Sequence, residues 1–182
     1  MLQAEEELLV LAAQEGSHDA FNQLVQYFQK PLLMFAYKLS SDMELSRDAV
    51  QDSWIRLAGR LGRLDDPRAF KSWIYRTVRW RVLDLLRTRK TVQIELDDIC
   101  CEANQNHDNL AVQHSVDNPQ ADNQQVLTVA INQLPAIERQ IIYLFYLDEM
   151  KLIEIAFVLD IPLGTVKSRL NRARKMLKEK FS

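Results

Sequence analysis

The sequence predicts an all-α protein in which two small helical domains are joined by a flexible acidic linker. Apolar residues recur every three or four positions in both halves of the chain, which is the period of an amphipathic helix. The composition then shifts over residues 91–125, which hold seven acidic and no basic side chains. With 182 residues, of which 47% are hydrophobic, the chain has enough apolar surface for the cores of one or two small domains.

The first domain is predicted to span residues 1–90. An apolar stripe over residues 21–39 predicts a first helix, bent or restarted at Pro31. The pattern Ser41-x-x-Glu44 resembles a capping box and predicts the start of a second helix. The buried stripe of this second helix is predicted to contain Leu45, Ala49, Val50, Trp54, Leu57 and Leu61.

A third, long helix completes the first domain. Asp66 is a good N-cap, and Pro67 suits the first helical position, so a helix can run from there to about Arg89. Residues 91–125 then form the linker, because a polar and acidic segment cannot bury enough apolar area to offset its ordering entropy.

The second domain is predicted to span residues 126–182 and to contain a helix-turn-helix. One helix runs from about Gln120 to Gln133, and the pattern restarts after Pro135 with helices over 136–147 and 151–159. A three-residue connection, 160–162, leads into the last helix. The buried stripe of that helix is predicted to contain Leu163, Val166, Leu170, Ala173 and Leu177.

Charge alternates in sign along the chain beneath a net charge of −2. Residues 56–90 carry 11 basic and 3 acidic side chains, and residues 163–182 carry 7 basic and 1 acidic. Two separated basic blocks suggest two surfaces that meet a phosphate backbone. Basic helix faces are also commonly only solvated, so charge alone leaves both interpretations open.

The last helix has the position and composition of a DNA recognition helix. At about 100° per residue, Ser168, Asn171 and Lys175 point away from the buried stripe, and Lys167 and Arg172 flank them. Lys and Arg pair with guanine edges and Asn pairs with adenine, so this set can read base sequence. Four further cations are predicted to contact phosphates, namely Arg169, Arg174, Lys178 and Lys180. The alternative is a basic helix that packs on another protein.

The other basic block mixes aromatic and cationic side chains. Phe70, Trp73, Tyr75 and Trp80 lie among Arg68, Lys71, Arg76, Arg79 and Arg81. Aromatic rings beside a positive track suit unstacked bases of single-stranded DNA. For any one of these rings, a place in the core is the favoured interpretation.

These stretches resemble the extracytoplasmic-function sigma factors of bacterial RNA polymerase over nearly the whole chain. The second domain is similar to sigma region 4 in Leu134-Pro135-Ala136-Ile137-Glu138-Arg139-Gln140, in Ile153-Glu154-Ile155-Ala156 and in the run from Ile161 to Arg174. The first domain is similar to sigma region 2 in residues 20–25, 48–54, 68–76 and 83–87. The family commonly has Asn where this chain has Trp80, so the base preference at that position stays open.

The resemblance implies an alternative sigma factor that binds core RNA polymerase and directs transcription initiation at particular promoters. Region 2 would dock on the clamp helices of the largest subunit through Asp48, Gln51, Asp52 and Trp54. It would open the −10 element with Arg68, Lys71, Trp73, Arg76, Arg79 and Trp80. Region 4 would touch the flap and read the −35 element with Thr165, Lys167, Ser168, Arg169, Asn171, Arg172 and Lys175. An anti-sigma factor, membrane-bound or free, is a further expected partner.

Other function classes lack their residues. The histidines have no Ser or Cys nucleophile at a motif spacing, and the glycines form no phosphate-binding loop, so no catalysis and no small-molecule substrate are expected. The adjacent Cys100 and Cys101 have no ligand-spaced partners, so no metal or other cofactor is expected. An acidic N-terminus without a long apolar run predicts a cytoplasmic protein. The alternative function is a helix-turn-helix regulator that acts without core polymerase.

Overall fold

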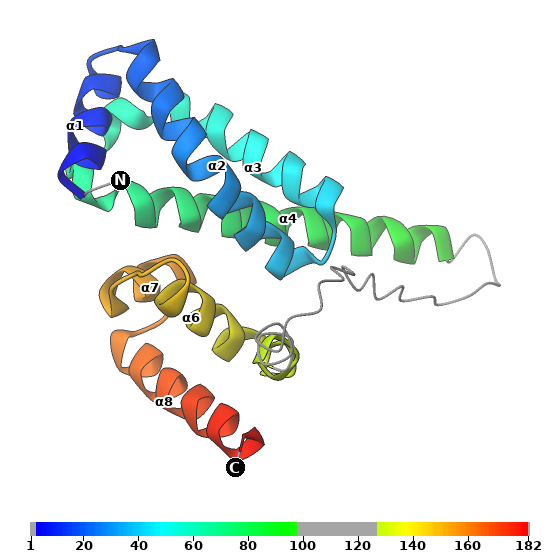
Figure 1. Ribbon diagram of the computed structural model, residues 1–182. Coiled ribbons are helices and arrows are strands. Elements are labelled where there is room, and N and C mark those ends of the chain that lie inside the picture. The colour runs from blue at the N-terminus through cyan, green and yellow to red at the C-terminus, as the bar shows by residue number, and fades with distance from the viewer. Residues whose placement is uncertain (1–2, 98–126, 182) are drawn as a thin grey trace, which may run out of the picture.

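A computed structural model of the chain describes residues 3–97 and 127–181, and every regular element in those two ranges is a helix (Figure 1). The predicted all-α class is therefore confirmed. The first range contains α1 (Gln3–Gln14), α2 (His18–Ser40), α3 (Met43–Ala58), two 3₁₀ turns (Leu61–Arg63 and Pro67–Ala69) and α4 (Phe70–Asp97). The second contains helical residues 127–132, α6 (Ala136–Tyr146), α7 (Leu152–Leu159) and α8 (Leu163–Lys180).

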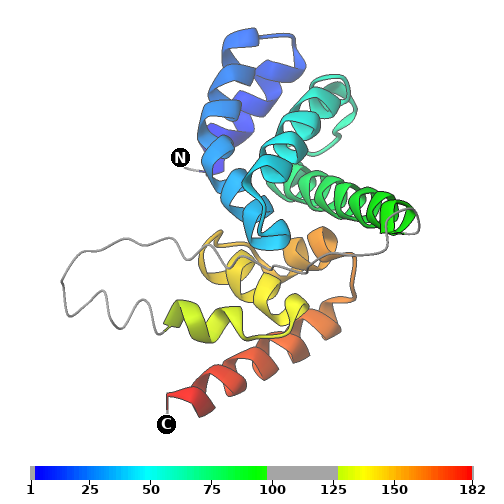
Figure 2. The same cartoon turned by 90° about the vertical axis from the view of Figure 1, so that its right-hand side faces the viewer.

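Helix α4 lies at the centre of the molecule. It packs against α2 and α3 on one side and against α7 on the other, as Figures 1 and 2 show from two directions. Helix α8 packs on α6 and α7 and lies farthest from the first domain. The arrangement leaves one side of α8 open to solvent.

The core of the first domain is built from the predicted apolar stripes. All six residues predicted for the stripe of the second helix are buried, from Leu45 to Leu61. Aromatic contacts join the helices: the rings of Phe28 and Phe70 lie 5.5 Å apart, and those of Phe35 and Tyr75 lie 5.1 Å apart. Offset and edge-on ring pairs at such distances add to the stabilisation that burial provides.

The helix boundaries predicted at Pro31 and Ser41 differ from the structure. Helix α2 continues through Pro31, and α3 begins one residue later than the Ser41 capping box would place it. Ser41 adopts a left-handed conformation (φ 57°) and donates its N–H to the Tyr37 carbonyl at 2.8 Å, so it closes α2. Because Ser41 is used to end one helix, Asp42 caps the next by accepting the Leu45 N–H at 3.0 Å.

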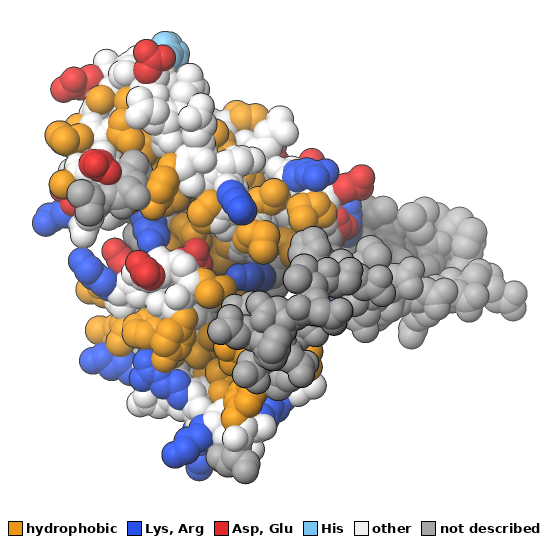
Figure 3. Space-filling view, viewed as in Figure 1, with side chains coloured by type: hydrophobic (Ala, Val, Ile, Leu, Met, Phe, Trp, Pro, Cys, Tyr) orange, Lys and Arg blue, Asp and Glu red, His pale blue; other side chains and the backbone are white. Residues whose placement is uncertain are grey.

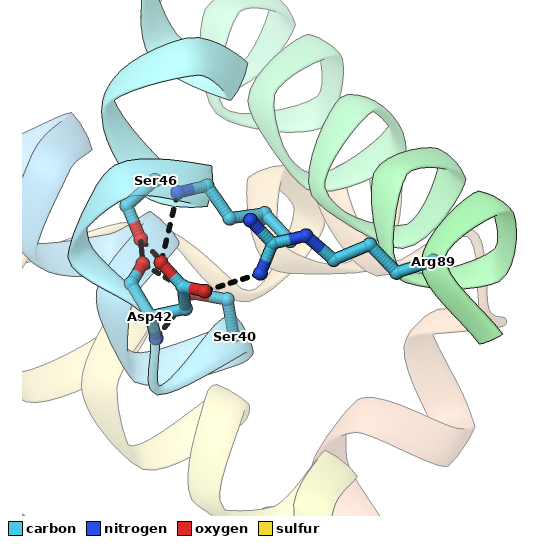
Figure 4. A network of polar contacts seen from close by, with 5 residues as sticks. Ser40, Asp42, Ser46 and Arg89 are labelled. Atoms are coloured by element: carbon cyan, nitrogen blue, oxygen red, sulfur yellow. Dashed lines mark hydrogen bonds and ion pairs between the residues drawn. The ribbon is translucent and has the colours of Figure 1, made fainter. Parts of the chain in front are cut away.

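Asp42 also anchors the C-terminal half of α4 to the turn between α2 and α3 (Figure 4). Its second carboxylate oxygen binds the guanidinium of Arg89. The hydroxyls of Ser40 and Ser46 lie 2.9 Å apart beside it, and Ser46 donates to the Asp42 carbonyl. The cap bond to the Leu45 N–H and the bond from Arg89 hold the pKa of the Asp42 carboxyl below its usual range.

We expect Asp42→Ala to lower the free energy of unfolding by about 0.5–2 kcal/mol, because the helix loses its N-cap. Asp48→Ala, an exposed acidic residue on the same helix, is the matched control and should change stability little. A carboxyl with a lowered folded-state pKa stabilises the fold above its unfolded-state pKa. The difference between wild type and Asp42→Ala should therefore shrink as the pH falls through the folded-state pKa. Thermal melts at several pH values measure it, and a pH-independent difference would contradict this account.

The first domain is larger than the sequence predicted. Helix α1 was not predicted, and it packs through Val10 while Gln14 donates to the carbonyls of Leu61 and Leu64 at 3.0 and 2.7 Å. Helix α4 continues to Asp97, so the predicted domain boundary at residue 90 and the first seven predicted linker residues fall inside a helix. The rest of the predicted linker, with Cys100 and Cys101, lies outside the described residues.

The helix-turn-helix forms as predicted. Residues 160–162 connect α7 to α8, and Asp160 takes the left-handed conformation (φ 59°) that closes α7. Asp tolerates this conformation better than most residues with a side chain. Of the predicted buried stripe, Val166, Leu170 and Ala173 are buried, but Leu177 is half-buried and Leu163 at the start of α8 is 37% exposed. Within the ranges that the structure describes, no helix is both long and apolar enough to cross a membrane.

Candidate nucleic-acid interface

The solvent-facing side of α8 carries a row of hydrogen-bond donors. Figure 3 shows Lys and Arg side chains gathered over the part of the molecule where α8 lies. Behind this row, the buried stripe of α8 packs on α6 and α7 and fixes the face that the helix presents. Of the seven α8 residues predicted to read the −35 element, five are exposed, namely Lys167, Ser168, Asn171, Arg172 and Lys175.

Two other predicted contacts on α8, Thr165 and Arg169, are half-buried. Ser168 donates its hydroxyl to the carbonyl of Thr165 at 3.0 Å, within the first turn of the helix. Arg169 donates to the carboxylate of Glu138 on α6 at 3.2 Å. Sequence reasoning did not single out Glu138, because an acidic residue in the first turn of a helix is ordinarily solvated.

Arg174, a predicted phosphate contact, is bound to the end of α6. Its Nε donates to the hydroxyl of Tyr146 at 2.9 Å, and its guanidinium lies 5.4 Å from the ring centre of Phe145. The side chain remains exposed, so it can keep these contacts and still present N–H groups to solvent.

The aromatic residues of α4 divide between core and surface. Phe70 and Tyr75 are buried, and Trp73 is half-buried against the core. Trp80 is 47% exposed, so its ring is accessible. Arg68 is also exposed, where it pairs with Asp66 at 3.0 Å. The interpretation of these rings as a DNA platform therefore has structural support only at Trp80 and in part at Trp73.

The cations of α4 contact the second domain. Arg76 forms an ion pair with Asp160 at 3.0 Å, and its guanidinium lies 4.4 Å from the ring centre of Phe157. Arg79 donates to the side-chain carbonyl of Gln140 at 3.3 Å, and burial lowers its pKa. Two of the six residues predicted to contact the −10 element are thus engaged within the protein.

A polar cluster around Asp148 forms the centre of this contact between the domains. The Tyr75 hydroxyl donates to the Asp148 carboxylate at 2.7 Å, and the Lys71 ammonium donates to the Asp148 carbonyl. The Lys38 ammonium lies 3.9 Å above the ring of Tyr143. Burial raises the pKa of the Asp148 carboxyl and lowers that of Lys38. Lys71 is therefore a third predicted −10 contact that is held by the second domain.

The predicted polymerase-binding residues lie on α3. Asp48 and Gln51 are exposed, and Asp52 is half-buried in an ion pair with Arg81 of α4 at 2.6 Å. Trp54 does not belong to the exposed face: it is 7% exposed. Its indole N–H donates to Gln29 at 2.9 Å, and its ring packs edge-on against Phe21. The structure thus assigns Trp54 to the core, because it belongs to the stripe that begins at Leu45 and whose members are all buried.

The described residues include no group of three or more His, Cys, Asp or Glu side chains that could hold a metal ion.

Comparison with known proteins matches both domains to one class. Residues 24–92 match the family Sigma-70 region 2, and residues 124–177 match Sigma-70, region 4. The chain is 30% identical to the ECF RNA polymerase sigma-E factor of Escherichia coli K12, over 98% of this chain and 95% of the relative. It is 27% identical to the ECF RNA polymerase sigma factor SigW of Bacillus subtilis, over 92% and 91%. The chain therefore belongs to the extracytoplasmic-function (ECF) RNA polymerase sigma factors, and the predicted resemblance is confirmed.

Solved structures agree with this assignment. The sigma factor RpoE of Bartonella quintana, in complex with the anti-sigma factor NepR, is similar with a TM-score of 0.65 and 26% identity, over 88% of this chain and 96% of that one. CnrH, in complex with the cytosolic domain of CnrY, has the same TM-score at 23% identity over 96% of both chains, a likeness of fold alone.

Proposed function

We propose that α8 reads the −35 promoter element through the exposed row that contains Lys167, Ser168, Asn171, Arg172 and Lys175. The observation that carries this assignment is the pairing of that row with the buried stripe behind it on the second helix of a helix-turn-helix. Thr165 and Arg169 complete the set from half-buried positions at its edge. Asn offers adenine a bidentate partner, and Lys or Arg offers one to guanine.

Helix α4 is assigned to the −10 element. Arg68 and Trp80 are accessible in the present arrangement, and Trp80 can stack an unpaired base. Lys71, Arg76 and Arg79 can reach DNA only after their contacts with the second domain are broken. Trp73 supports this face from a half-buried position.

The exposed acidic side of α3 is assigned to core RNA polymerase. Asp48, Gln51 and Asp52 would meet the clamp helices, with Trp54 supporting them from the core, while the second domain would touch the flap. Acidic side chains face solvent there, which suits a protein partner better than a phosphate backbone.

The remaining assignments follow from family membership. The chain acts as a binding subunit, with no catalytic residue or cofactor of its own, in the cytoplasm where its polymerase and promoters are. An anti-sigma factor is a partner, in line with the complex of the Bartonella quintana relative with NepR.

Substitution of the α8 row tests the −35 assignment. With core polymerase and genomic promoter fragments, mapped transcript starts identify the promoters that the wild-type protein uses; a regulator that acts without core polymerase would yield none. On such a promoter, Asn171→Ala or Arg172→Ala should cost about 1–3 kcal/mol of binding when the −35 element is intact. On the same fragment with a scrambled −35 element, the loss should be much smaller.

Arg174→Ala is the matched control on the same helix. Arg174 carries the same charge as Arg172, but it lies on the side of α8 that contacts Tyr146. Its truncation should therefore weaken binding to the intact and the scrambled fragment alike. Equal losses on both fragments for Asn171→Ala and Arg172→Ala as well would overturn the assignment of base contacts.

A further inference from the structure

Glu138 is the one charged side chain that is fully buried among the residues the structure describes. It is the third residue of α6, and its side chain is 1% exposed beneath α8. Ionised groups are rarely buried unless they are paired, because water no longer solvates them. Two cations lie close enough to pair with its carboxylate.

Both cations come from the recognition helix. Glu138 Oε1 accepts from Arg169 Nη1 at 3.2 Å and lies 3.7 Å from Arg172 Nη1. The two arginines are three positions apart on α8, so they lie on neighbouring turns of one side. The other oxygen, Oε2, is buried and has no hydrogen-bond partner among the described residues.

The geometry points to Glu138 as a positioning residue for −35 recognition, an inference that rests on the proposed function of α8. One carboxylate oxygen is shared by a half-buried guanidinium and an exposed one. Arg169 is thereby held on the protein, and Arg172 keeps its remaining N–H groups free for the major groove. A guanidinium whose orientation is fixed before binding loses less entropy when it pairs with a base.

The same carboxylate restrains binding to the phosphate backbone. It offsets part of the positive charge of Arg169 and Arg172, and it keeps Arg169 from reaching a phosphate. Contacts to phosphate raise affinity for every sequence, whereas base contacts discriminate between sequences. Glu138 thus favours discrimination over total affinity, although it touches no DNA itself.

Glu138→Gln tests this role, because it keeps the shape and an acceptor oxygen but removes the charge. Holoenzyme containing the variant is titrated with a promoter fragment, and with the same fragment carrying a scrambled −35 element, over a series of salt concentrations. We expect tighter binding to the scrambled fragment and a salt slope steeper by about 0.9, which corresponds to one more phosphate contact. The ratio of intact to scrambled affinity should fall about 3- to 10-fold, less than the full loss of a bidentate base contact would cause.

A second pair of variants separates positioning from stability. Ile141→Val trims a fully buried residue one turn along α6 and leaves the charge of the helix unchanged. A merely structural role predicts that Glu138→Gln behaves like Ile141→Val, with a lower melting temperature and an unchanged salt slope. In the background of Arg169→Ala, the Glu138→Gln effect on the salt slope should disappear, because the released cation is gone.

The outcomes distinguish this inference from the proposed function. If wild-type holoenzyme does not discriminate between intact and scrambled −35 elements, the assignment of α8 itself fails. If the wild type discriminates and Glu138→Gln keeps the same ratio and salt slope, only the role of Glu138 is overturned. An effect of Glu138→Gln that persists fully in the Arg169→Ala background would also contradict it.

Discussion

Asp148→Lys is expected to separate the two domains of the free protein. The substitution removes the acceptor of the Tyr75 hydroxyl bond and places a third cation beside Lys71 and Lys38. Leaving a buried donor without its acceptor typically costs about 1–3 kcal/mol, and the introduced ammonium also repels the two lysines. The Arg76–Asp160 ion pair is partly exposed and the Arg79–Gln140 hydrogen bond is 3.3 Å long, so we expect the loss of the Asp148 cluster to open the contact between the domains.

Small-angle scattering of the free protein measures the opening as an increase in the radius of gyration. Glu149→Lys is the matched control: it makes the same change of charge one residue along, at an exposed position outside the cluster. Circular dichroism should show the same helix content for both variants. A scattering curve for Asp148→Lys that superimposes on that of Glu149→Lys would show that the Asp148 cluster does not hold the domains together.

The Asp148→Lys variant, with its domains separated, should also bind single-stranded DNA more tightly than the wild-type protein does. The cations Lys71, Arg76 and Arg79 cannot contact the second domain and a phosphate at the same time. Each phosphate contact that is released adds about 0.7 to the salt slope for a single strand. A salt titration of binding to a single-stranded oligonucleotide measures this increase. Equal salt slopes for Asp148→Lys and Glu149→Lys would mean that these three cations do not bind phosphates of single-stranded DNA.

Trp54→Ala is expected to lower the free energy of unfolding by about 3–5 kcal/mol, the usual cost of truncating a buried Trp. The ring fills the space between α2 and α3, packs edge-on against Phe21 at 5.8 Å and donates to Gln29. For a domain of this size, 1 kcal/mol corresponds to about 4–8 °C in melting temperature. A thermal melt should therefore show a shift well above 10 °C.

Gln51→Ala on the same helix separates binding from folding. Gln51 is exposed, so its truncation should leave the melting temperature unchanged while it weakens binding to core polymerase. Trp54→Ala should weaken polymerase binding only in proportion to the fraction of protein it unfolds. If Trp54→Ala melts like wild type but fails to bind core polymerase, the indole of Trp54 contacts the polymerase directly and this prediction is wrong.

Helix faces could be predicted from the sequence, because burial within a helix depends mainly on local spacing. The stripe from Leu45 to Leu61 is buried as predicted, and so is the middle of the last stripe, from Val166 to Ala173, whereas Leu163 at its start is exposed. The exposed row of α8 follows from the second stripe by geometry alone. Helix ends were predicted less well: Ser41 was assigned to the start of α3, whereas it closes α2, because two local hydrogen-bonding patterns compete for the same residue.

The sequence by itself therefore determined the helical class, the two stripes and the donors available to DNA. Only the tertiary structure decided which charges meet. Tyr75 and Asp148 lie 73 residues apart, and Arg169 and Glu138 lie 31 apart, so no local pattern links them. Such pairs form only after the helices have packed, because packing removes water from a charge and makes its nearest opposite group its partner. The same packing left Trp80 exposed, although Phe70 and Tyr75 on the same helix are buried.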